Sequence, residues 1–142
     1  MANGEKKKAV SFRFGTSTIE RLKERSAETG SAQGVLAERY IEEGLQMDDH
    51  PGIYFRDGGS GRRPALLGTR LDVAEVIETL RQNSSSVAEA ADYLDLSPAQ
   101  VEMAVRYYAE YQRDVDAWIA QSRAIAERER ELSAKREAAL AR

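Results

Sequence analysis

The chain has 142 residues, no cysteine, 21 basic and 24 acidic side chains, and a formal net charge of -3. The lack of cysteine excludes a disulfide framework and a thiolate nucleophile, and no apolar run reaches the length of a membrane span or a signal-peptide core. We therefore expect a helix-rich cytoplasmic protein, not inserted in a membrane, with one domain or two small ones.

Residues 9–14 have the alternating pattern of a β-strand. Val10, Phe12 and Phe14 fall on one face of this strand, and the residues between them fall on the other. No second strand follows, because the next segment already has a helical pattern. Since a lone strand is unstable in water, we expect it to pair with the same strand of a second copy, in a homodimer or a higher oligomer. Such a ribbon can enter the major groove of DNA.

Two helices are predicted after this strand, over residues 16–28 and 32–45. Residues 16–18 offer N-caps for the first helix, Gly30 fits its end, and Ser31 fits the N-cap of the second. This order of strand, helix, glycine turn and helix resembles the ribbon-helix-helix repressors of the Arc, MetJ and CopG type over about the first third of the chain. The alternative is that residues 9–14 form an edge strand of another small domain.

The resemblance implies which residues contact DNA. In that family the outward strand residues touch bases, and the N-terminus of the second helix holds a phosphate. By position, the base-reading residues are Ala9, Ser11 and Arg13, and the phosphate-binding residues are Ser31, Ala32 and Gln33. Ala9 has no hydrogen-bonding side chain, so base readout depends on Ser11 and Arg13.

Basic charge is concentrated at the N-terminus. Residues 1–25 hold seven basic and three acidic side chains, whereas residues 26–50 hold one and six. Lys6, Lys7 and Lys8 are therefore expected to attract DNA phosphates, and the alternative for them is a disordered solubilising tail.

A second module is predicted at residues 53–112, separated from a first domain at 1–47 by a polar linker at 48–52. Strands at 53–55 and 64–67 are expected to flank a flexible loop at 56–62 and to form a small hairpin. A helix over residues 73–82 follows. A short helix at 87–94 and another beginning at Pro98, capped by Ser97, then form a helix-turn-helix.

This module resembles a family of small bacterial domains of unknown function that accompany PIN-type toxins as VapB-like antitoxins. The similarity covers about residues 52–111, with a longer, glycine-rich loop between Phe55 and Pro64. The matching positions are Gly68, Thr69, Arg70, Leu71, Val73, Ser85, Ser86, Leu94, Leu96, Ser97, Val101, Ala104, Val105, Tyr107 and Tyr108.

The charge of this second module argues against DNA recognition by its helix-turn-helix. Residues 51–112 hold six basic and nine acidic side chains, so phosphates would be repelled. We expect a packing or dimerising module. The alternative is that Arg62, Arg63 and Arg70 contact a DNA backbone.

Residues 113–142 are predicted as a helical tail that binds a protein partner. They contain no glycine or proline, and apolar residues recur every seven positions. We expect an apolar stripe to enter a toxin groove while an arginine reaches acidic catalytic residues. PIN-type toxins are similar to metal-dependent ribonucleases, whose active site is a carboxylate cluster. The expected partner-binding residues are Trp118, Ile119, Arg123, Ile125, Arg128, Leu132 and Arg136. The alternatives are a solvated tail and a helix that packs on its own dimer mate.

No pattern predicts catalysis, a metal site or a cofactor. His50 is the single histidine and lies in the linker, so no His/Cys cluster offers a zinc site. The serines at 84–86 have no partner base and fit a helix cap and hinge. The glycine-rich segment 58–61 lacks the context and the lysine of a nucleotide loop. We therefore expect that the protein is not an enzyme.

The sequence thus predicts a mostly α protein with a ribbon-helix-helix N-terminus, a β-hairpin plus helix-turn-helix module and a long C-terminal helix. The predicted function is a type II antitoxin that binds the double-stranded DNA of its own promoter, represses its operon and neutralises a PIN-like toxin. One alternative is a transcriptional or plasmid copy-control regulator without a toxin. The other is a structural oligomerisation protein that does not bind DNA.

Overall fold

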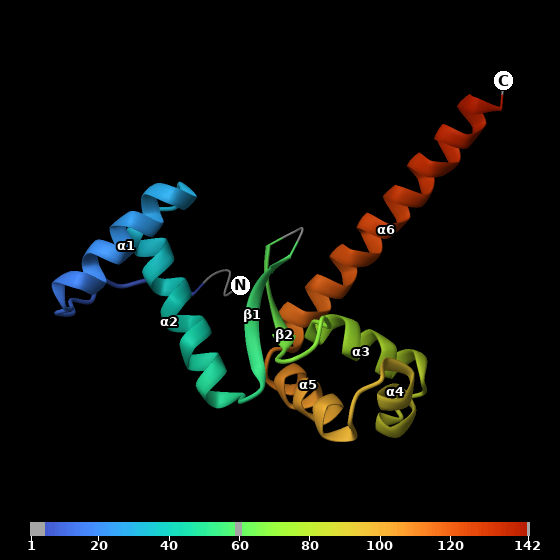
Figure 1. Ribbon diagram of the computed structural model, residues 1–142, viewed down its shortest axis with the longest axis horizontal. Helices are drawn as coiled ribbons and strands as arrows, with labels where there is room; N and C mark the ends of the chain where they lie inside the picture. Colours follow the sequence, from blue (N-terminus) through green and yellow to red (C-terminus); the bar gives the residue numbers. More distant parts are fainter. Residues whose placement is uncertain (1–4, 59–60, 142) are drawn as a thin grey trace. The chain divides into compact units, whose positions relative to one another are not determined.

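A computed structural model describes residues 5–58 and 61–141 of the chain. The described residues form six α-helices and a two-stranded antiparallel sheet (Figure 1), which confirms the mostly α fold with a small hairpin. The elements in chain order are α1 (Thr16–Thr29), α2 (Gln33–Asp49), β1 (Ile53–Gly58), β2 (Gly61–Leu66), α3 (Val73–Gln82), α4 (Val87–Leu94), α5 (Pro98–Glu110) and α6 (Gln112–Leu140). The chain divides into two compact units, Met1–Pro51 and Gly52–Arg142.

The first unit contains α1 and α2, joined by a short turn. Gly30 ends α1 in a left-handed conformation with φ of 71°, as predicted for a glycine at this position. The predicted N-caps are wrong at both helices: Gly15 precedes α1 and Ala32 precedes α2, and neither cap has a side-chain hydrogen bond. Ser31 serves the turn instead, because its carbonyl accepts a hydrogen bond from the Ser26 hydroxyl at 2.6 Å.

Residues 5–15 have no regular secondary structure in the single chain. A strand is defined by hydrogen bonds to a neighbouring strand, and no described residue supplies one to residues 9–14. Their apolar side chains lie open to solvent, with Val10 58% exposed, Phe12 68% and Phe14 49%. The Phe12 and Phe14 rings contact each other at a centroid distance of 5.9 Å. The first unit therefore leaves this apolar side uncovered.

The hairpin of the second unit is longer than predicted. Its register pairs Ile53 with Leu66 and continues to Gly58 opposite Gly61, so most of the expected loop at 56–62 belongs to paired strands. Asp57 lies opposite Arg62 in this register, and such a pair of opposite charges supports the longer ladder. Part of the glycine-rich segment 58–61 lies outside the described residues.

Helices α3 and α4 have the predicted ranges, and α5 begins at the predicted Pro98. Asp72 and Glu75 form a capping box at α3, and Ser97 and Gln100 form another at α5, with Pro98 in the first turn. Ser86 caps α4 through a hydrogen bond from the Glu89 N–H. These helices and the hairpin enclose one apolar core whose fully buried side chains include Leu66, Val73, Val76, Ile77, Val101, Tyr107 and Val115.

The long helix α6 has a docked part and a projecting part. Val115 and Ile119 are 0% and 3% exposed in the core of the second unit, and α6 contacts both α3 and α5. Every side chain described from residue 127 to residue 141 is exposed, and Figure 1 shows this part of α6 extending away from the other helices of its unit. None of the described helices combines the length and apolar character needed to span a membrane.

Candidate nucleic-acid interface and partner surfaces

The basic N-terminal arm is solvent-exposed. Lys6, Lys7, Lys8 and Arg13 are all exposed, and Lys7 Nζ lies 3.1 Å from Glu38 Oε2 of α2. Both side chains of this ion pair are largely solvated, so it contributes less than about 1 kcal/mol and yields readily to a phosphate. The predicted base-reading residues Ala9, Ser11 and Arg13 are likewise exposed, and Arg13 has no ion-pair partner among the described residues.

The first unit carries an apolar surface much larger than its own core. Leu36 is its single buried hydrophobic side chain in the described part of the chain, and α1 has no buried residue. The exposed large apolar side chains of this unit are Val10, Phe12, Phe14, Val35, Tyr40, Ile41, Leu45 and Met47. Exposed apolar side chains in such number are typical of an interaction surface.

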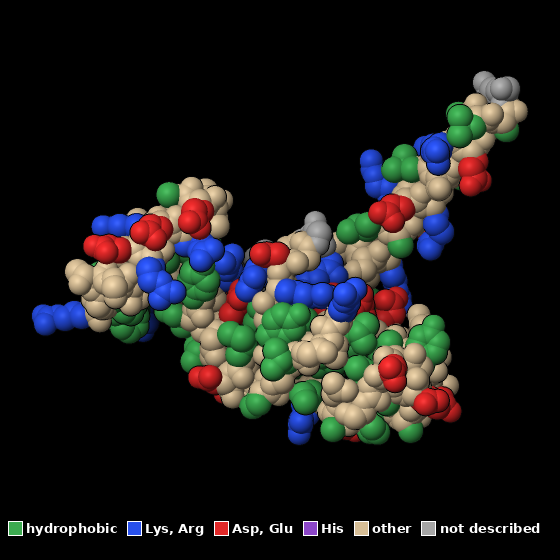
Figure 2. All heavy atoms as spheres, in the orientation of Figure 1, with side chains coloured by type: hydrophobic (Ala, Val, Ile, Leu, Met, Phe, Trp, Pro, Cys, Tyr) green, Lys and Arg blue, Asp and Glu red, His purple; other side chains and the backbone are tan. Residues whose placement is uncertain are grey.

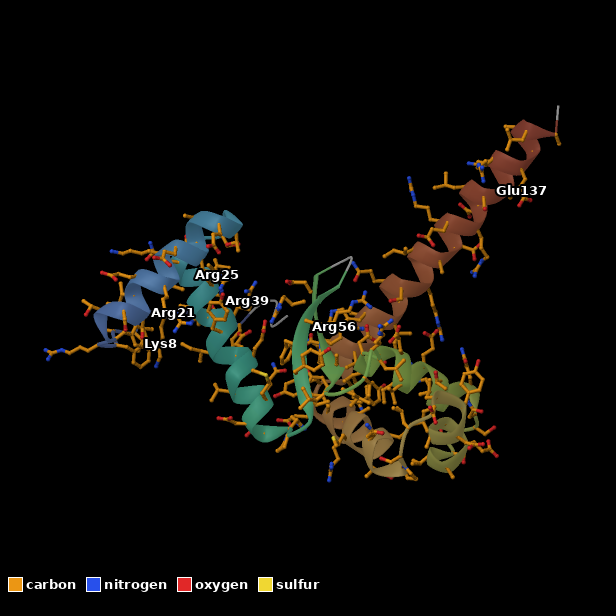
Figure 3. All side chains as sticks on the ribbon, in the orientation of Figure 1. Lys8, Arg21, Arg25, Arg39, Arg56 and Glu137 are labelled. Atoms are coloured by element: carbon orange, nitrogen blue, oxygen red, sulfur yellow. The ribbon has the colours of Figure 1, made fainter. Side chains whose placement is uncertain are left out.

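A groove of about 470 Å³ lies within this surface. Its apolar lining comes from the end of the arm and from both helices: Phe14, Ile19, Leu22, Ala37, Tyr40 and Ile41. Arg21 and Arg25 of α1 (Figure 3) also line it, together with Thr18. The end of the candidate ribbon and a hydrophobic groove therefore occupy the same part of the first unit.

The start of α2 is an open helix N-terminus. Ala32 and Gln33 are exposed and Ser31 is partly exposed, and no side chain caps the helix. The first backbone N–H groups of a helix have no intrahelical acceptor, so they remain available to an anion here. The Ser31 N–H is an exception, because it donates to Thr29 Oγ1 at 3.3 Å. Among the predicted phosphate-binding residues, those at the start of the helix fit an anion better than Ser31 does.

The three arginines predicted in the second module have different environments. The Arg63 side chain is 11% exposed, lies 3.5 Å from Asp72 Oδ2, and donates to Ser122 Oγ of α6 at 3.1 Å. This largely buried side chain joins β2 to the N-terminus of α3 and to α6, which argues against the alternative of a DNA contact at Arg63. Arg62 lies 3.5 Å from Asp57 Oδ1 and donates to the Phe55 carbonyl at 3.4 Å. Arg70 is exposed and remains accessible.

Three side chains that the sequence analysis missed connect α3, α5 and α6. Arg81 Nη2 donates to the Tyr108 hydroxyl and to Asp116 Oδ1 at 2.8 Å, and the Tyr108 hydroxyl donates to the same oxygen at 3.0 Å. The hydrogen bond from Arg81 lowers the pKa of Asp116 and raises that of Arg81, whereas burial is the main cause of the raised pKa of Tyr108. No sequence spacing could reveal this group, because each residue comes from a different helix.

The predicted partner-binding residues of α6 fall into two groups. Ile119 is 3% exposed in the core, which leaves it no free surface for a partner, whereas Trp118 packs against the core, is only partly buried, and stays a predicted contact. Their side chains face α3 and α5 because the first turns of α6 dock there. Arg123 Nε donates to Glu78 Oε1 of α3 at 2.9 Å. The other group is exposed and consists of Ile125, Arg128, Leu132 and Arg136.

The exposed part of α6 has an apolar stripe bordered by basic residues. Ile125 and Leu132, two helical turns apart, are 43% and 53% exposed. With 3.6 residues per turn, Arg128 borders the stripe on one side, and Arg136 and Glu129 border it on the other. Glu137 (labelled in Figure 3) is five positions after Leu132, which places it away from the stripe by the same helical spacing. Basic side chains therefore outnumber acidic ones beside this stripe.

Chemistry-bearing side chains do not gather elsewhere in the described residues. No group of three or more His, Asp or Glu side chains within residues 5–58 and 61–141 could hold a metal ion. His50 forms the C-cap of α2, where its N–H donates to the Gln46 carbonyl at 2.9 Å. Ser86 is a helix cap, and Ser84 and Ser85 have positive φ values in the preceding turn.

Comparison with known families gives one match. The model of a family described as "Protein of unknown function (DUF433)" matches residues 56–108, which run from β1 to α5. The chain is thus similar to that family over the hairpin and α3–α5, less than half of its length, and the match does not include α1, α2 or α6. Neither the curated proteins nor the solved structures provide a match.

Proposed function

We propose that the protein is a dimeric ribbon-helix-helix repressor that acts as a VapB-like antitoxin. The observation that carries this proposal is the uncovered apolar side of the first unit, which contains Phe12, Phe14 and the groove between α1 and α2. Leu36 alone cannot make this unit a stable single-chain domain, since small domains need a larger buried core. A second copy supplies the missing apolar surface.

The dimer explains the alternation in residues 9–14. Two copies of this segment pair antiparallel, and Val10, Phe12 and Phe14 of each copy are buried against the helices. The opposite face of the ribbon then carries Ser11 and Arg13 into the major groove, where an arginine fits the acceptors of guanine. Phosphates are contacted by Lys6–Lys8 and by the open N-terminus of α2, which fix the position of the ribbon on the duplex.

A toxin is proposed as the partner of α6. An isolated helix of about fifteen residues is marginally stable in water, so the projecting part gains from a partner that covers Ile125 and Leu132. A PIN-like ribonuclease presents a carboxylate cluster that a guanidinium can bind. The charge of the exposed face therefore supports an acidic, heterologous partner.

The test of the repressor proposal is binding to the DNA upstream of the protein's own gene at 50 and 200 mM salt. We expect salt-sensitive binding that Arg13→Ala weakens by about 1–3 kcal/mol, or about 5- to 150-fold, because a base contact is lost. Arg113→Ala is the matched control, since it removes another exposed arginine, from the start of α6. Equal affinity of both variants would reject base reading by Arg13. No binding at either salt would leave the ribbon as a dimerisation element only.

A further inference from the structure

The Gly-Thr-Arg segment after β2 is a rigid turn. Gly68 has a φ of 79°, a conformation that a glycine adopts without strain. The Thr69 hydroxyl donates to the Leu66 carbonyl at 2.9 Å and accepts a hydrogen bond from the Leu71 N–H at 3.1 Å. The turn is thus closed from both sides by one side chain. Arg70, the third residue of the segment, is held on this turn with its side chain exposed.

A second arginine is attached to the same turn. Arg56 of β1 (Figure 3) donates from Nη2 to the Arg70 carbonyl at 2.9 Å. Arg56 lies opposite Arg63 in the hairpin and on the same face, and the two like charges go to different partners, Arg63 to Asp72 and Arg56 to the turn. The Arg56 guanidinium is therefore bound to the backbone of the residue that carries the second cation, Arg70.

The carboxylates at this end of the unit are engaged by other groups. Between residues 53 and 78 the acidic side chains are Asp57, Asp72, Glu75 and Glu78. Asp57 and Asp72 pair with Arg62 and Arg63, Glu75 accepts the Asp72 N–H in the capping box, and Glu78 pairs with Arg123. Within the described part of the chain neither Arg56 nor Arg70 has a carboxylate partner. Basic side chains gather over the hairpin in Figure 2.

We propose that Arg56 and Arg70 form a phosphate-binding pair that contacts the backbone of duplex DNA. Guanidinium groups donate paired hydrogen bonds to phosphate oxygens, and two cations without counter-charges favour an anionic ligand. The choice of DNA over another polyanion rests on the proposed function of the first unit. Because the two units are covalently linked, a second backbone contact acts at a high effective concentration and raises the affinity of the whole chain.

This pair differs from the alternative that the sequence left open, a DNA contact at Arg62, Arg63 and Arg70. It keeps Arg70, adds Arg56, and excludes the buried Arg63 and the paired Arg62. The contact is independent of base sequence, so it strengthens binding to every duplex. It also gives the acidic second unit a local basic surface at the rigid turn.

The test uses the full chain, its promoter duplex and an unrelated duplex of equal length, each titrated from 50 to 300 mM salt. We expect Arg56→Gln/Arg70→Gln to lower the affinity for both duplexes at least tenfold at low salt. The slope of log affinity against log salt should fall by about 1.8 per chain, about 0.9 for each lost phosphate contact. Arg106→Gln/Arg113→Gln is the control with the same charge change on exposed positions of α5 and α6.

Arg70→Gln alone guards against misfolding, because the Arg70 side chain has no hydrogen bond among the described residues. It should produce about half of the change in slope.

Slopes and affinities of both variants equal to those of the control would overturn the proposal and assign the pair to a different ligand, such as carboxylates of a protein. Arg13→Ala separates this proposal from that of the ribbon. Loss of promoter binding with Arg13→Ala, but not with the Arg56/Arg70 variant, would reject the phosphate-binding pair and leave base reading by the ribbon intact. The reverse pattern would reject base reading and support the pair.

Discussion

Replacing Phe12 by alanine tests the dimer directly. Phe12 is the most exposed of the three ribbon hydrophobics in the single chain, at 68%. Complete burial of a phenylalanine side chain contributes about 1.5–3 kcal/mol, so burial of this exposed fraction contributes about 1–2 kcal/mol per copy. A symmetric dimer contains the residue twice. Phe12→Ala should therefore cost about 2–4 kcal/mol and raise the dimer Kd by about 30- to 1,000-fold.

Sedimentation equilibrium over a series of protein concentrations measures this change. The matched control is Leu140→Ala, which removes an apolar side chain that is 72% exposed near the end of α6, outside the proposed ribbon. The control should keep the Kd of the natural chain. The core of the second unit does not include Phe12, so the thermal unfolding of that unit should not change. A dimer Kd that Phe12→Ala leaves unchanged would refute the reasoning, because it would mean that the ribbon face is not the dimer interface.

Three further predictions concern the second unit. Asp116→Asn should lower the free energy of unfolding by less than about 1 kcal/mol near pH 7, because this half-exposed ion pair is screened. Since the folded-state pKa of Asp116 is lowered, the stabilisation is present above the ordinary pKa of about 4 and is lost as the pH falls through the folded-state pKa. A difference in stability between the variant and the natural chain that grows in acid would contradict the assignment. Arg63→Ala should destabilise the unit by about 3–5 kcal/mol in denaturant titrations, because it leaves the Asp72 carboxylate buried without its cation. Adding Asp72→Ser should recover part of this loss, and a double variant whose destabilisation equals the sum of the two single ones would argue against the pair. Leu132→Asp should abolish co-purification with a PIN-type nuclease encoded beside the gene, whereas Ala138→Asp, on the opposite side of α6, should not. Capture of the nuclease by both variants would exclude the stripe as the contact.

Features that depend on a few neighbouring residues could be predicted from the sequence. Gly30 ends a helix because it adopts positive φ without a steric penalty, and Ser97, Pro98 and Gln100 start one because their side chains and ring act within a single turn. The same holds for helices α3 and α4, whose predicted ranges agree with the structure. The hairpin could be predicted to exist, but its length depends on cross-strand pairs, which turn signals do not determine.

The assignment of side chains to a core, an ion pair or an open surface required the tertiary structure. Ile119 and Ile125 belong to the same broad apolar pattern, yet only Ile119 is buried, because α3 and α5 cover just the first turns of α6. Arg63 and Arg70 are equally basic in sequence, but Asp72 and Ser122 surround the first and leave the second exposed. The sequence determined these local elements and their amphipathic faces through short-range chemistry. Which face met a neighbour, and which charge stayed without one, was decided only by packing between residues far apart in the chain.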